Sequence, residues 1–433
     1  MRYEPQCSFT RPRFRLLLMG DCPRWLKMLY KTRPCIVEGS FRPGCIITFR
    51  WVMSRCGVGA YRSERPEILI AALARSSKNG HPFMKHEALL LLCLLLILIF
   101  PHGAQGQEEN NYGTWSLYWE NDYLAKTDSN YTNGMRLTWT SPWISWKPDG
   151  DSVPPGTTPW YHSLTKAMPF FYSPGFHSAM FLAVGQSIYT PDDLSREDLI
   201  VNDRPYAGYL YLGFGFIRRS ALTMDTLEVD VGIVGRHSYA EDVQEQVHQW
   251  IGNLEPQGWA NQLKDEPALG ITYERKWKWL KTEIGSDWGY DLIPHAGGSV
   301  GNVAIYANAG AELRFGWNRP NNFGSCTIRP GCDSGAFPDD ENPQRSGGSR
   351  FGIFFFLGAD GRAVLHDIFL DGNTFQDSHS VEKKPFVADF SAGLGFTASN
   401  LKVTYAVVYR TKQFESQPHN EQLFGSLLVS YFY

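Results

Sequence analysis

The sequence is poor in the patterns that mark common chemistry. Beyond residue 110 it has no run of 20 apolar residues, which excludes a membrane-spanning helix in that region. It has no C-x-x-C pair and no H-E-x-x-H motif, so the usual structural and hydrolytic zinc sites are not predicted. We also expect no nucleophile elbow of the serine-hydrolase kind, and therefore no serine nucleophile.

The first hundred residues differ in composition from the rest. Residues 1–81 carry 15 Lys and Arg against five acidic residues and show no sustained periodicity. A basic residue then precedes thirteen apolar residues, Ala88 to Phe100, which are too few to cross about 30 Å of hydrocarbon as a helix. Small residues follow at a spacing that suits cleavage. We therefore interpret 84–106 as a signal peptide and 1–83 as an over-extended N-terminus outside the mature protein, with a genuine basic cytoplasmic extension as the alternative.

Residues 107–433 would then form the mature chain, with 25 basic and 38 acidic residues. This acidic balance argues against nucleic acid as a partner and suits divalent cations. Of the eight cysteines only Cys326 and Cys332 would remain, and their spacing suits a small disulfide loop in an oxidising compartment.

Apolar and polar residues alternate along much of this chain. Leu210, Leu212, Phe214 and Phe216, for example, share one face of an extended strand. A soluble sandwich and a transmembrane barrel both contain such strands. Charges and glycines on the opposite faces, aromatic residues at strand ends, strand lengths near ten and a final aromatic residue favour the barrel.

We predict an all-β fold, a transmembrane antiparallel β-barrel of about 12 strands, which is an even number as in bacterial barrels. The connections near 142–176 and 318–349 are expected to be surface loops. Residues 240–253 instead show helical spacing, with acidic residues in the first turn and Gly252 near the end, so one short helix is predicted between two strands. The strands are expected near 112–123, 131–141, 177–189, 206–219, 222–236, 267–278, 283–295, 301–317, 350–361, 384–396, 400–412 and 422–433.

The predicted helix carries the first candidate residues for chemistry. Gln244 and His248 are four residues apart, so their side chains point to the same side. A rigidly held His248 suits a general base, and an exposed surface histidine is the alternative. Glu255, Asp265 and Glu266 follow in a long polar connection, and any of them could orient the imidazole.

Two further polar motifs flank predicted strands. Asn121 and Asp122, within YWENDYLAKTDSNYTNG, offer hard oxygen ligands for a cation such as Ca²⁺, and a simple turn is the alternative. In VNDRPYAG, Arg204 adds a permanently charged fork suited to phosphate or carboxylate. The alternative for this motif is a turn at a strand entry.

These motifs together carry a resemblance. END followed by YTNG, then NDRPYAGYLY, Q-x-x-x-H on a helix and GWANQLKDEPAL are similar to the outer-membrane lipid A 3-O-deacylase family, in the same order from about Gly113 to Tyr433. The resemblance implies a twelve-stranded barrel in the bacterial outer membrane that removes the 3′-linked acyloxyacyl chain of lipid A, the membrane anchor of lipopolysaccharide, by ester hydrolysis. It also implies a requirement for Ca²⁺.

The resemblance implies roles for particular residues. His248 would be the general base that activates water, with Gln244 as its neighbour in the site. Asn121 and Asp122 would hold or orient the cation. Thr132 would line the site from the second strand.

The resemblance also suggests roles for Arg204 and Glu255, and two other classes of protein are alternatives to the deacylase. Arg204 resembles a basic position suited to the substrate phosphates, and Glu255 is our choice for the family's helper carboxylate. The substrate would enter laterally from the outer leaflet, and we expect a monomer. The alternatives are an outer-membrane phospholipase or other lipid esterase, and a non-enzymatic, porin-like barrel.

Overall fold

The computed structural model describes residues 113–122, 130–145, 159–285, 287–325, 327–328 and 351–433, together with two short strands near the N-terminus. The chain divides into two units, Met1–Met84 and Lys85–Tyr433. In the first unit, β1 (Phe14–Leu16) pairs antiparallel with β2 (Val37–Gly39). Apart from these two strands, the predicted over-extended N-terminus, the signal peptide and the Cys326–Cys332 pair lie outside the described residues.

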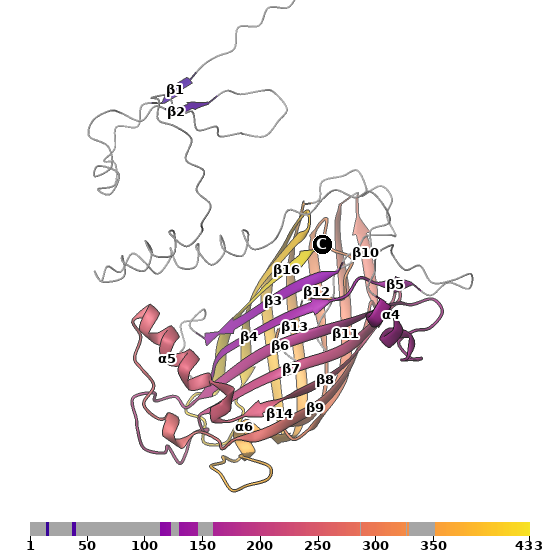
Figure 1. The fold of residues 1–433 in the computed structure, drawn as a ribbon. Helices are drawn as coiled ribbons and strands as arrows, with labels where there is room; N and C mark the ends of the chain where they lie inside the picture. Colours follow the sequence, from indigo (N-terminus) through magenta and orange to yellow (C-terminus); the bar gives the residue numbers. More distant parts are fainter. Residues whose placement is uncertain are drawn as a thin grey trace, which may run out of the picture. The chain divides into compact units, whose positions relative to one another are not determined.

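The second unit forms a closed antiparallel β-barrel (Figure 1). The ring closes because β16 pairs with β3 and β9 pairs with β11, so the wall satisfies its own backbone hydrogen bonds, as hydrocarbon requires. The predicted 12-stranded barrel is confirmed, with β10 (Leu280–Ile284) as an extra strand beside β11 and the two-residue β5 (Ile144–Ser145) beside β6. The wall consists of β3 (Thr114–Asn121), β4 (Asn130–Thr140), β6 (His177–Thr190), β7 (Ala207–Arg219), β8 (Thr223–Val234), β9 (Glu266–Trp277), β11 (Trp288–Gly301), β12 (Ala304–Trp317), β13 (Phe351–Asp367), β14 (Phe386–Ala398), β15 (Leu401–Thr411) and β16 (Glu421–Phe432).

The predicted strand near 283–295 has the wrong boundaries. Gly285 adopts a left-handed backbone with φ of 70°, which glycine tolerates without steric cost, and the chain turns there. As a result β10 ends at Ile284 and β11 begins at Trp288. β13 also runs further than predicted, to Asp367.

The wall is apolar outside and polar inside. Leu182, Val184 and Leu212 alternate with buried residues and are exposed on the outer surface, as side chains facing lipid must be apolar. On the lumen side, Arg136 of β4 and Glu228 of β8 form an ion pair of 2.8 Å, with β6 and β7 between their strands. Charges on the face opposite the apolar one are among the features that favoured a barrel over a soluble sandwich in the sequence.

The connection after β12 enters the lumen, so the expectation of a surface loop is wrong for residues 318–325. Phe323 is buried beside Ile293 of β11. Arg319 donates to Asp291 at 2.5 Å, and Asp291 also accepts from Arg314 at 2.7 Å. The segment is stabilised in the lumen because it supplies further partners for charges that are buried there.

The described part of the connection before β6 covers the outside of the wall. It contains α4 (Pro159–Lys166), a helix that the sequence did not predict. Tyr161 and Phe171 are buried against Phe216 of β7. Residues 159–176 are therefore packed onto the barrel, in contrast to the expected surface loop.

The two rims of the barrel differ. At one rim the backbone N–H of Tyr433 donates to the carbonyl of Gly113 at 3.1 Å, so both ends of the wall meet there; we call this the terminal rim. The opposite rim carries α5 (Ala240–Ile251) and the short α6 (Ile368–Asp371), and we call it the helix rim (Figure 1). The helix predicted at 240–253 is confirmed as α5. Of the helices in the described part of the chain, none is long and apolar enough to cross a membrane.

Candidate functional site

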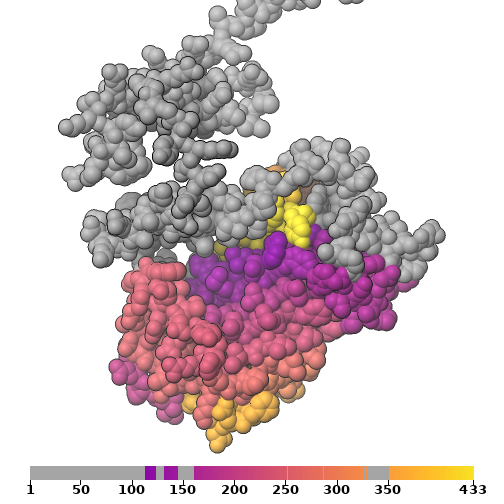
Figure 2. Space-filling view, in the orientation of Figure 1, coloured from indigo at the N-terminus to yellow at the C-terminus, as the bar shows by residue number. Residues whose placement is uncertain are grey.

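Helix α5 packs on the outward side of the wall at the helix rim. Ala240 and Val243 contact a cluster that contains Ile188 of β6, and Ile188 has the same strand alternation as the exposed Val184. Figure 2 shows the salmon-coloured residues that include α5 lying against the purple and magenta strands of the wall. The helix therefore places its side chains outside the barrel rather than in its lumen.

The turn before α5 is held by contacts to β6 and β7. Gln186 of β6 donates from Nε2 to the carbonyl of Ser238 at 2.7 Å. Gly235 has a φ of 106°, a conformation that favours glycine, and its N–H donates to Gly208 of β7 at 3.0 Å. These contacts fix where α5 begins.

Asp265, which the sequence offered as an orienter of His248, instead holds this turn. Its carboxylate accepts from the backbone N–H of His237 at 2.8 Å and lies 2.5 Å from Nδ1 of the same residue. Burial raises the pKa of the Asp265 carboxyl, but the hydrogen bonds and charge of His237 outweigh burial and keep that pKa below its ordinary value. The carboxylate of Asp265 therefore binds His237 rather than His248.

His248 and Gln244 share the barrel-facing side of α5 and are 4% and 3% exposed. Nδ1 of His248 lies 2.5 Å from the carbonyl oxygen of Leu254. Because a carbonyl can only accept, Nδ1 carries the proton in the neutral imidazole and Nε2 keeps its lone pair. Oε1 of Gln244 accepts from the indole of Trp259 at 3.0 Å, and its Nε2 has no hydrogen-bond partner among the described residues.

The partner of the imidazole is a backbone carbonyl rather than one of the predicted carboxylates. Gly252 ends α5 with a left-handed φ of 66°, which turns the chain back so that Leu254 reaches His248. The side chain of Glu255 is exposed. Glu266 accepts from Asn302 at 2.9 Å. In the sequence, Gly252 is the feature that indicates the turn by which the Leu254 carbonyl reaches His248.

In the first hairpin of the barrel, hydrogen bonds join the end of β3 to the start of β4. Nδ2 of Asn121 donates to the carbonyl of Thr132 at 3.0 Å. A register shift between Tyr131 and Asn133 marks a bulge at Thr132, whose hydroxyl shares a hydrogen bond of 2.7 Å with that of Thr190. Thr190 lies two residues along β6 from the Ile188 that packs against α5. A continuous set of contacts therefore links this hairpin to the helix of His248.

Asp122 directly follows Asn121 and is 1% exposed. Its carboxylate, the amide oxygen of Asn121 and the hydroxyl of Thr132 are hard oxygen donors of the kind that Ca²⁺ takes. Within the ranges that the structure describes, no group of three or more His, Cys, Asp or Glu side chains is arranged to hold a metal. The donor types of these three residues are therefore of the kind that the predicted Ca²⁺ would take.

Arg204 lies apart from these residues, among lumen-facing side chains. It is 1% exposed, and its guanidinium lies over the rings of Tyr189 and Phe414 at 5.2 and 5.8 Å. Burial lowers the pKa of this guanidinium below its ordinary value. Nε and Nη1 have no hydrogen-bond partner in the described part of the chain, so Arg204 retains donors for an anion.

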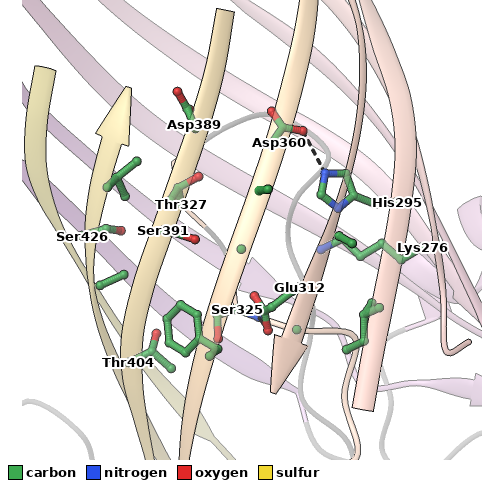
Figure 3. A pocket seen from close by; sticks show the side chains of 18 of the residues that line it. Lys276, His295, Glu312, Ser325, Thr327, Asp360, Asp389, Ser391, Thr404 and Ser426 are labelled. Carbon is green, nitrogen blue, oxygen red and sulfur yellow. Dashed lines mark hydrogen bonds and ion pairs between the residues drawn. The ribbon is translucent and has the colours of Figure 1, made fainter. Parts of the chain in front are cut away.

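A cavity of about 70 Å³ lies in the lumen and is separate from α5 (Figure 3). His295 points to Asp360, with Nε2 and Oδ1 2.8 Å apart, and Asn308 donates to the same oxygen at 3.0 Å. Glu312 accepts from the backbone N–H of Ser325 at 3.0 Å. His295 and Asp360 are thus engaged with each other, and Glu312 with the inward segment.

One short string does carry the spacing of a serine-hydrolase elbow, GGSVG at 297–301. The structure places it inside β11, which is paired with β9 on one side and β12 on the other. The hydroxyl of Ser299 accepts from Thr272 at 2.9 Å. An elbow needs a sharp turn from strand to helix, and this string lies in a continuous strand instead.

The close contact at Gly208 gives a test of how α5 is seated. A Cβ on this residue would lie 2.1 Å from Oγ of Ser238 and 2.3 Å from Cβ of Ala240, so Gly208→Ala must displace the start of α5. We expect the free energy of unfolding to fall by about 1–3 kcal/mol, as for other overpacked sites, in urea titrations of the purified barrel. Gly270→Ala is the matched control, because its Cβ would meet nothing closer than 4.0 Å. Equal unfolding midpoints for the two variants would contradict this seating.

The fold and the site define a class of protein. A closed antiparallel barrel with an apolar outer surface, a charged lumen and both ends at one rim is an outer-membrane β-barrel, here with a polar site on its outer wall. The chain belongs to the family described as "Outer membrane protein LpxR", whose model matches residues 89–433. The resemblance to the outer-membrane lipid A 3-O-deacylase family is thereby confirmed at the level of the family.

Solved structures were compared with the fold. The structure of LpxR from Salmonella typhimurium is similar with a TM-score of 0.56 at 15% sequence identity, over 74% of this chain and 100% of that chain, which shows the fold. The β-domain of the Bordetella autotransporter Brka follows with a TM-score of 0.37 at 9% identity, over 74% and 99%. The COG4313 outer-membrane channel from Pseudomonas putida F1 gives 0.30 at 11% identity, over 77% and 100%. No curated protein gives a significant match to the chain.

Proposed function

We propose that this protein hydrolyses the 3′-linked acyloxyacyl ester of lipid A, with His248 as the general base. The observation that carries the proposal is the buried imidazole, fixed through Nδ1 to the Leu254 carbonyl at 2.5 Å on the outer wall of a barrel of the LpxR family. A site on the outer wall is accessible to a lipid that moves within the leaflet. A site in the lumen would not be.

The geometry of His248 suits the proton transfer. Since Nδ1 is held by a carbonyl, Nε2 is the atom that would take a proton from water as the water attacks the ester. The same proton can then pass to the leaving alkoxide. No covalent enzyme intermediate is needed. Gln244 would assist with its Nε2 donor, which lies one helical turn from the imidazole and is not used by the described residues.

Asp122 and Asn121 would hold Ca²⁺ in this proposal. Bound Ca²⁺ supplies Lewis-acid chemistry, which polarises a carbonyl and stabilises the oxyanion of an acyl-transfer reaction. Asp122 contributes the negative charge that attracts the cation. The two hydrogen bonds donated by Asn121, at 3.0 and 3.3 Å, fix its amide so that the oxygen points away from them. Thr132 would line the site beside them.

The roles of Arg204 and Glu255 stay predictions. Arg204 keeps two donors that could bind a substrate phosphate, but its partners Tyr189 and Phe414 lie on the lumen side. The exposed carboxylate of Glu255 lies one residue from the carbonyl that fixes His248. Either residue would act from the edge of the site.

The lumen argues against the porin-like alternative. Arg136 and Glu228 pair inside the wall, and Arg314, Asp291 and Arg319 form a second ionic cluster with the inward segment. These groups occupy the volume that an aqueous channel would need.

Mass spectrometry of lipid A tests the proposed reaction. Cells that express the protein should lose one 3′ acyloxyacyl group from lipid A, compared with cells that carry an empty vector. Intact lipid A together with altered phospholipids would support the phospholipase alternative instead. No change in either lipid would contradict both enzymatic readings.

A further inference from the structure

Helix α5 has three differently composed sides. Ala240, Gln244 and His248 are buried against the barrel. The flank on one side consists of Val243, Val247 and Trp250, which are spaced by four and three residues and so lie in one row. Trp250 is 77% exposed, which is unusual for a residue that buries so much apolar surface when it can.

The opposite flank of α5 is acidic. Glu241 and Glu245 are four residues apart and share that side. Burial, and then the neighbouring carboxylates of Glu241, Glu255 and Asp242, raise the pKa of Glu245, so the acidic groups lie near one another. The two flanks therefore differ in what they can face: one suits an apolar medium, and the other suits water.

The apolar flank lies close to the lipid-facing surface of the wall. Gly208 of β7 touches the start of α5, and Leu212, four residues along the same strand, is 67% exposed on the outer surface. At about 3.3 Å per strand residue, the helix starts roughly 13 Å from this lipid contact. On β6 the same spacing separates Ile188, which packs on α5, from the exposed Val184.

We propose that α5 is an interfacial helix, with Trp250 and the following Leu254 inserted among the acyl chains of the leaflet at the helix rim. Trp favours membrane interfaces, and helices with one apolar and one charged side lie in the plane of the interface. Leu254 is 54% exposed while its carbonyl holds His248, so the insertion of this segment sets the depth of the imidazole. The inference rests on the membrane location of the barrel and is independent of the hydrolysis.

The test measures depth in vesicles that contain no lipid A. A nitroxide is attached to Trp250→Cys, in a chain whose native cysteines are replaced by serine, and the barrel is reconstituted in phosphatidylethanolamine and phosphatidylglycerol. We expect the label to collide with oxygen and to be shielded from a water-soluble nickel chelate, as a label at Leu212→Cys on the wall is. The control at Gln249→Cys, one residue before Trp250 and exposed, should be accessible to the chelate.

A label at Trp250→Cys that is as accessible to the nickel chelate as the one at Gln249→Cys would overturn the proposal. The shift between unheated and heated samples on a denaturing gel shows whether each variant forms the barrel. If Trp250→Cys does not fold, Leu254→Cys reports on the same segment. Because the vesicles contain no substrate, absence of deacylation in other assays leaves this result unchanged.

Discussion

His248→Ala is expected to lower the deacylation of lipid A by about 10²–10⁴-fold, the usual contribution of a positioned general base. The substitution removes the only imidazole on α5 and leaves the wall of the barrel unchanged. The rate is measured as the appearance of deacylated lipid A by mass spectrometry, with purified protein in mixed micelles. Folding is checked by the gel shift on heating.

His237→Ala is the matched control for this prediction. Both histidines belong to the segment at the helix rim, but His237 is exposed and its Nδ1 is bound to Asp265. Its loss should change the rate by less than about threefold, because an exposed partner of a turn contributes little. The role of His248 is falsified if His248→Ala retains the activity of the wild type, or if both variants lose activity equally.

Removal of Ca²⁺ is expected to abolish the deacylation of lipid A. Asp122→Asn is expected to cause the same loss of activity at any practical Ca²⁺ concentration. Asparagine keeps the shape of the side chain and removes the charge that would attract the cation. A loss of at least about a hundredfold is expected, since one lost stabiliser of an oxyanion typically costs 10²–10³-fold. Activity is followed during titration of a chelator and then of added CaCl₂.

Asp198→Asn separates the cation site from general effects of charge. Asp198 is an exposed carboxylate near the same rim, paired with Arg196. This variant should keep both its activity and the Ca²⁺ concentration for half-maximal rate. Full activity of the wild type in excess chelator would remove the cation from the mechanism, and an unchanged Ca²⁺ response in Asp122→Asn would move the cation to other residues.

The wall and α5 were predictable because their signals are local. A period of two residues marks a strand between lipid and lumen, and the row of Val243, Val247 and Trp250 marks a helix. The family motifs supplied the chemistry that periodicity cannot. Boundaries failed where one residue decides the geometry, as at Gly285, whose left-handed turn separates β10 from β11.

Two features were not predictable from residue types. The orienter of His248 is a backbone carbonyl, and every residue has one, so the sequence drew attention to carboxylates such as Glu255 instead. The inward path of residues 318–325 depends on pairings such as Arg319 with Asp291, which are 28 residues apart in the sequence. Both depend on tertiary geometry rather than on local pattern.

The inward segment of residues 318–325 has a consequence for the cell envelope. The outer membrane limits the entry of many hydrophilic compounds because its pores are few and narrow, and a barrel as wide as twelve strands could weaken that barrier. Here Arg319 and Phe323 enter from the terminal rim and contact the lumen wall, so the segment narrows the lumen. If the proposed deacylation takes place, a bacterium could raise the copy number of this protein and remodel its outer leaflet without opening a wide route for small hydrophilic toxins.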